Sequence, residues 1–76
     1  MDLDNLIVMA NRIGQFFAAL PDRAEALAGI AEHLKKFWEP RMRAQILAVV
    51  GTAQGAGLSE IVVAALTTHR ALLQPA

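Results

Sequence analysis

Few residues in this sequence could carry out chemistry, and they are widely spaced. The chain has two histidines, His33 and His69, a single serine, and neither cysteine nor tyrosine. We expect the histidines on different helices, and neither has a carboxylate at the spacing of a metal site. The lack of cysteine excludes a disulfide, a thiolate zinc site and a cysteine-held iron–sulfur cluster in this sequence. We therefore predict no catalytic, cofactor-binding or metal-binding residue. We interpret His33 as solvated or interfacial and His69 as half-buried or interfacial.

A glycine-rich stretch at residues 51–57 is the next candidate, because glycine amides that precede a helix can bind a phosphate group. This stretch lacks the lysine and the following serine or threonine of a P-loop, and no strand is expected before it. We expect it to be a flexible connector between helices.

Positive charge is concentrated in residues 33–43, although the formal net charge of the chain is zero. Arg41 and Arg43 fall in the first turn of a predicted helix, where the dipole disfavours a cation by a few tenths to about 1 kcal/mol. A local rule broken in this way often marks a functional site, and arginine pairs well with carboxylates. We predict that this segment binds a partner through His33, Lys36, Trp38, Arg41 and Arg43. The alternative is that Trp38 belongs to the core and that the arginines are solvated or paired with nearby acids.

These residues must be positioned by helices, because apolar residues recur with helical spacing nearly everywhere and no segment alternates for long as a strand would. We predict a single all-α domain over residues 1–76, a small compact bundle of about four helices. The predicted helices cover about residues 3–20, 22–38, 40–50 and 59–73, and prolines separate the first three.

The apolar stripes also predict which side chains face inward. The expected inward residues near the helix ends are Phe17, Leu20, Phe37, Trp38 and Leu72. Met42, Ile46 and Val49 form the expected ridge of the third helix, which leaves both arginines outside it. Gly14 lies within the first stripe, where its missing side chain would let another helix approach closely.

Hydrophobic residues make up 55% of the 76-residue chain, which is high for so small a domain. A chain of this length buries only about 60–65% of the surface that its unfolded form exposes. Some apolar surface should therefore face a partner. Met9 and Phe16, beside the main stripe of the first helix, are candidates, and they could also support self-association of the isolated chain.

Charge and hydropathy narrow the possible partners and the location. A net charge of zero favours neither nucleic acid nor an anionic membrane. The apolar run at residues 61–66 is far too short to span a bilayer, and the acidic start of the chain is unlike a secretory signal. We therefore expect a soluble, cytoplasmic protein. A DNA-binding helix would need base-reading groups, and the third helix offers only Arg41 and Gln45 among alanines.

Two stretches resemble a known family. They are residues 9–17, MANRIGQFF, and residues 29–43, GIAEHLKKFWEPRMR. Together they are similar to the delta subunit of soluble NAD-dependent formate dehydrogenases. The run FWEPRMR, preceded by His33, is the most distinctive part, and Gly57 and Leu58 before a short apolar helix also fit the family.

This resemblance implies a cytoplasmic multi-subunit enzyme that oxidises formate to carbon dioxide and reduces NAD. In such enzymes the large alpha subunit holds a molybdenum or tungsten bis-pterin guanine dinucleotide and iron–sulfur clusters, and other subunits carry FMN and further clusters. The resemblance implies that this chain holds no cofactor and is a non-catalytic subunit that binds the large catalytic subunit for assembly or stability. The alternatives are a transient chaperone for molybdenum-cofactor insertion, or an unrelated helical adaptor or DNA-binding protein.

Overall fold

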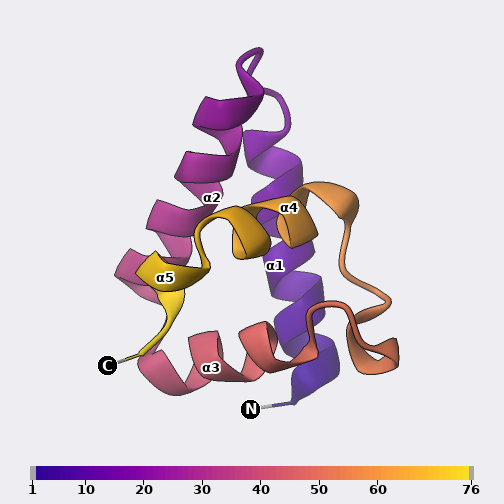
Figure 1. The fold of residues 1–76 in the computed structure, drawn as a ribbon. Coiled ribbons are helices and arrows are strands. Elements are labelled where there is room, and N and C mark those ends of the chain that lie inside the picture. Colours follow the sequence, from indigo (N-terminus) through magenta and orange to yellow (C-terminus); the bar gives the residue numbers. More distant parts are fainter. Residues whose placement is uncertain (1, 76) are drawn as a thin grey trace.

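Two long helices that lie side by side form the frame of the molecule (Figure 1). The computed structural model describes residues 2–75. The elements in chain order are α1 (Leu3–Phe17), α2 (Arg23–Phe37), α3 (Pro40–Val49), the 3₁₀ helix η1 (Ala53–Gly55), α4 (Glu60–Thr68) and α5 (Arg70–Leu73). α3 crosses the lower ends of the frame, and α4 crosses its front and contacts both long helices (Figure 1). The prediction of an all-α bundle is confirmed.

The first connection is tighter than expected. α1 ends at Phe17 rather than at residue 20, because the next amides bond three residues back, from Ala19 to Phe16 and from Leu20 to Phe17. Such i to i−3 bonds tighten the last turn of a helix into 3₁₀ geometry. As a result Leu20 is exposed and does not face inward as predicted. Asp22 then caps α2 by accepting a hydrogen bond from the Glu25 amide at 3.3 Å.

The last predicted helix is divided in two. α4 ends at Thr68, and His69 takes a bent conformation with φ −110° and ψ 27° before α5 begins. This break changes the helical register, so Leu73 is buried while Leu72 is exposed. The prediction that Leu72 faces inward is therefore wrong.

One apolar core holds the helices together. Its largest fully buried side chains are Leu6, Ile30, Leu34, Ile46, Val62, Leu66 and Leu73. Gly14 allows α4 to pack tightly against α1, because a Cβ at this position would lie 2.6 Å from Cγ2 of Val62. The close approach predicted for Gly14 is thus confirmed.

The glycine-rich stretch is held in place at both ends. The amides of Gly55, Ala56 and Leu58 donate to carbonyls within the stretch, so these groups are not free to bind a phosphate. At its far end, the Asn11 side chain donates to the Gly57 carbonyl at 2.9 Å and accepts from the Ser59 amide at 2.8 Å. Asn11 therefore ties the connector to α1 and caps α4, a role that the sequence did not indicate.

Within residues 2–75, no helix is both long enough and apolar enough to cross a membrane.

Candidate partner-binding surface

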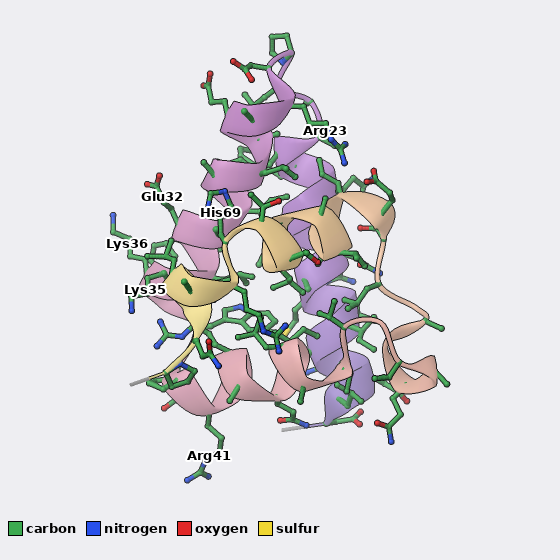
Figure 2. All side chains as sticks on the ribbon, in the orientation of Figure 1. Arg23, Glu32, Lys35, Lys36, Arg41 and His69 are labelled. Carbon is green, nitrogen blue, oxygen red and sulfur yellow. The ribbon has the colours of Figure 1, made fainter. Side chains whose placement is uncertain are left out.

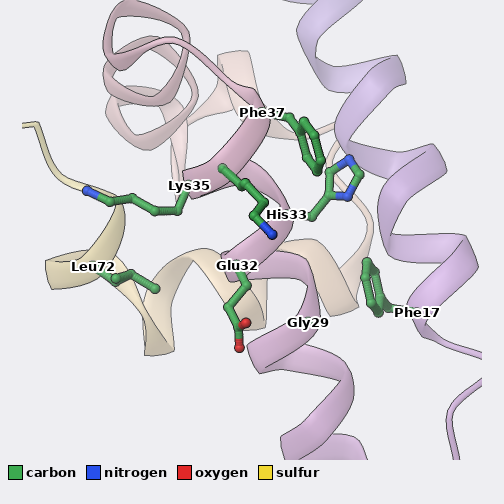
Figure 3. Close-up of a pocket in the computed structure, with 8 residues that line it drawn as sticks. Phe17, Gly29, Glu32, His33, Lys35, Phe37 and Leu72 are labelled. Atoms are coloured by element: carbon green, nitrogen blue, oxygen red, sulfur yellow. The ribbon is translucent and has the colours of Figure 1, made fainter.

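Four rings form a continuous line across α1 and α2, which we call the aromatic row. Its members are Phe16, Phe17, His33 and Phe37. The ring centroids of Phe16 and Phe17 are 5.2 Å apart in an edge-to-face arrangement, and those of Phe17 and His33 are 6.3 Å apart. His33 and Phe37 lie closer, at 4.8 Å (Figure 3). These separations are typical of favourable aromatic pairs.

The helices place these rings together by simple spacing. Phe16 and Phe17 occupy the last turn of α1, while His33 and Phe37 are four residues apart and so lie on one face of α2. The Phe17 ring rests on Gly29 of α2, where a Cβ would come within 2.5 Å of its Cε1 atom. The absent side chain at Gly29 therefore makes room for the central contact of the row (Figure 3).

The ends of the row are unusually exposed for aromatic residues. Phe16 is 74% exposed and Phe37 is 67% exposed, whereas Phe17 and His33 are half-buried. The prediction that Phe37 faces inward is wrong, because the helix ends there and the chain turns Trp38 toward the core instead. Exposed, clustered aromatic side chains are typical of binding surfaces.

Two hollows flank the row. One is lined by Arg12, Ile13, Phe16, Phe17 and His33. The other extends from Phe17 of α1 across α2 to Leu72 of α5, and Gly29 and Phe37 also line it (Figure 3). Phe17 and His33 line both hollows, so this pair forms the ridge between them.

Charged side chains surround the aromatic row unevenly. Three cations line the hollows, Arg12, Lys35 and Lys36, together with one carboxylate, Glu32. None of the four forms an ion pair within residues 2–75, where the salt bridge joins Arg23 of α2 to Glu60 of α4. This surface is therefore positively charged, although the chain as a whole is neutral.

The predicted partner-binding residues do not all lie on one surface. Phe16, His33 and Lys36 belong to the aromatic row or its rim. Met9 is half-buried against the core, and it lies two helical turns before Phe16 on the same side of α1. Arg41 is exposed on α3 and projects away from the row (Figure 2).

Trp38 and Arg43 lie inside the protein, each only 6% exposed. The expectation that the Arg43 side chain lies outside the apolar ridge is wrong. Its Nη1 donates to the Lys35 carbonyl at 3.0 Å, one of the last carbonyls of α2 that lack a partner within the helix. Its Nε is buried without a hydrogen-bond partner among residues 2–75. Arg43 therefore caps the C-terminal end of α2 from its position on α3. Trp38 is part of the core.

Sequence reasoning missed Phe37, Phe17, Arg12 and Lys35 as members of this surface. The spacing of His33 and Phe37 was a usable signal, because a histidine four residues before an aromatic residue on a helix shares its face. Residues 2–75 hold no group of three or more His, Cys, Asp or Glu side chains that could bind a metal ion. His69 lies half-buried at the bend between α4 and α5.

The fold and this surface define a small all-α protein with an exposed, positively charged aromatic face. Residues 5–66 match the family described as the NADH-dependent formate dehydrogenase delta subunit, FdsD. The chain belongs to this family, as the resemblance of residues 9–17 and 29–43 predicted. The match runs from α1 into α4 and includes every ring of the aromatic row. No curated protein and no solved structure is significantly similar to the chain.

Proposed function

We propose that this chain is a non-catalytic subunit of a cytoplasmic NAD-dependent formate dehydrogenase, and that it binds the large catalytic subunit through the aromatic row. The observation that carries the proposal is the exposure of Phe16 and Phe37 at the two ends of the aromatic row, in a member of a formate dehydrogenase subunit family. Burying these rings against a partner would remove a large apolar area from water, which favours association.

In this proposal the chemistry belongs to the other subunits. The molybdenum or tungsten bis-pterin guanine dinucleotide, the iron–sulfur clusters and FMN would be held there, and this chain would contribute contact surface for assembly or stability. The imidazole of His33 is the titratable group within the row, and its ring packs between Phe17 and Phe37. Arg41 is exposed on α3 and lines neither hollow, so the proposed contact does not include it.

The test is to express the chain with an affinity tag together with the other subunits of the enzyme. We expect the large subunit to co-elute with the chain and the eluted complex to reduce NAD with formate. The isolated, metal-free chain should have no such activity. A chain that elutes alone from cells containing the active complex would contradict the binding proposal, and formate oxidation by the isolated chain would contradict the non-catalytic one.

The same preparation separates a permanent subunit from an assembly factor. A permanent subunit should be present in the mature, cofactor-loaded complex in a fixed ratio to the large subunit. A transient assembly factor would instead be enriched on cofactor-free large subunit and missing from the active enzyme. Quantitative mass spectrometry of the loaded and cofactor-free fractions measures this ratio.

A further inference from the structure

The shape and charge of the aromatic row and its hollows indicate what kind of partner segment binds there. Resting on the proposed function, we infer that the row receives an acidic amphipathic helix of a partner subunit. Large apolar side chains of that helix enter the two hollows on either side of the Phe17–His33 ridge. Carboxylates on its flanks pair with Arg12, Lys35 and Lys36.

The shape of the surface argues for protruding apolar side chains in the partner. Both hollows are concave, and their walls are largely apolar, from Ile13 and Phe16 at one end to Phe37 and Leu72 at the other. The surface is formed by α1, α2 and α5, and residues 2–75 offer no strand edge to which an extended peptide could add. A groove between helices is the usual receptor for the apolar face of another helix, which inserts anchors one or two turns apart.

The charge of the surface argues for carboxylates in the partner. Arg12, Lys35 and Lys36 line the hollows together with a single carboxylate, Glu32, which gives the surface three positive charges and one negative charge. These cations have no ion-pair partner within residues 2–75, so their pairing capacity is available to another molecule. Complementary charges around an apolar contact set the specificity and the rate of association.

The same charges disfavour a second copy of this chain as the occupant. A symmetric dimer through this face would bring the identical patch against itself, so the three cations of one copy, Arg12, Lys35 and Lys36, would lie against the same three of the other. Like charges that meet across an interface destabilise it. Self-association through the apolar rings should therefore strengthen as salt screens the repulsion, whereas the complex with an acidic helix should weaken.

An anionic membrane would also attract cations and aromatic rings, but the shape fits it less well. A helix that binds at a bilayer surface presents a protruding apolar face along its own length. Here the row runs across two helices, its central rings are half-buried, and the space beside them is hollow. This surface suits the insertion of a partner's side chains better than its own insertion into lipid.

The first test identifies the occupant in the assembled complex. A photo-reactive benzoylphenylalanine replaces Phe16 or Phe37, and Ala48, exposed on α3, is the matched control position. We expect cross-links from Phe16 and Phe37 to a segment of another subunit in which apolar residues at helical spacing are flanked by Asp or Glu. Cross-links to a basic or uncharged segment, to a second copy of this chain or to lipid would overturn the inference, as would an intact complex without cross-links from either position. If the wild-type chain forms no complex with the other subunits, the proposed function fails as well.

The second test reverses charge at matched positions. The double substitution Arg12→Glu and Lys36→Glu should weaken binding to the other subunits by about tenfold or more, and it should remove the sensitivity of binding to sodium chloride. Arg41→Glu makes the same kind of change on the exposed face of α3 and should alter binding less than about twofold. Equal binding by the double variant and the wild type would overturn the inference. A loss confined to Arg41→Glu would do so too, because it would move the charged contact to α3.

Discussion

Phe37 and Trp38 are neighbours in the sequence, yet one is 67% exposed and the other 6%. The same contrast separates Arg41, which is exposed, from Arg43, which is buried. The most distinctive segment of the chain therefore has two faces with two roles. Its inner face joins α2 to α3, and its outer face completes the aromatic row. Residues in one motif can therefore hold the fold together while their immediate neighbours remain available for a partner.

The inner face depends on where α2 stops. Trp38 leaves helical geometry, with φ −93° and ψ 135°, and Glu39 is also extended, because the residue before a proline is disfavoured in the helical region and Pro40 begins α3. This turn directs the indole into the core and brings Arg43 back toward the last carbonyls of α2. The outer face needs no such turn, since His33 and Phe37 share a face of the regular helix.

Truncating the two aromatic neighbours should give the largest contrast. We expect Trp38→Ala to destabilise the fold by about 3–5 kcal/mol, because it leaves a cavity in the core of a small domain. Phe37→Ala should cost at most about 1 kcal/mol, since it removes only an exposed ring contact with His33. Urea unfolding followed by circular dichroism measures both. Similar losses for the two variants would remove the distinction between the two faces.

The arginine pair offers a second contrast of intermediate size. Arg43→Ala should destabilise the fold by about 1–3 kcal/mol, because the Lys35 carbonyl loses its donor in a buried place. Arg43→Lys should recover part of this loss, since an ammonium group can still donate to that carbonyl. Arg41→Ala should change stability by no more than about 0.5 kcal/mol. Thermal unfolding of the three variants tests this order, and a stable Arg43→Ala protein would show that the cap does not matter.

A smaller effect is expected at Asn11, which extends the comparison to another inward polar side chain. Asn11→Ala should cost about 1–2 kcal/mol, because it removes both the donor to Gly57 and the cap of α4. Asn11→Asp should lose less, since it keeps the acceptor for the Ser59 amide. Gln15→Ala, at an exposed position on the same helix, is the control. Amide hydrogen exchange at the start of α4 should quicken in Asn11→Ala and not in the control.

The smallest effect belongs to the exposed ion pair between Arg23 and Glu60. Arg23→Ala should cost less than about 1 kcal/mol, because both side chains are well solvated. That cost should shrink as sodium chloride is added, whereas the cost of Arg43→Ala should hardly change, since its bond is shielded from solvent. Unfolding of the two variants at low and high salt measures this, and an equal salt response would contradict the buried position of Arg43.

Part of this arrangement was predictable from the sequence. Helical periodicity and the prolines that separate the helices were sufficient to predict the all-α fold and the first three helices. The burial of Arg43 was also encoded, because it lies three and four residues before Ile46 and Leu47 and so shares their inward face. The unfavourable position of Arg43 in the helix dipole, on which the partner-binding prediction rested, does not indicate the direction in which the side chain points.

The aromatic row could not be predicted in the same way. The contact between Phe17 and His33 joins two helices, and it depends on how closely α1 approaches α2 at Gly29. The periodicity of a sequence predicts the helix face on which a residue lies. It does not predict the positions along two helices at which they come into contact. The bend at His69 also leaves Leu72 exposed at one of the hollows, and no proline or glycine marks that bend in the sequence.

We propose that the aromatic row binds the other subunits of the enzyme. The most direct measurement is the affinity of a Phe16→Ala and Phe37→Ala double variant for those subunits, compared with a Val8→Ala and Leu20→Ala variant. The control residues are also exposed and apolar, but they lie outside the row. We predict that the double phenylalanine variant remains folded at the temperature of the measurement and loses about 2 kcal/mol or more of binding free energy, while the control binds as the wild type does. Wild-type affinity in the double phenylalanine variant, or an equal loss in the control, would contradict the claim.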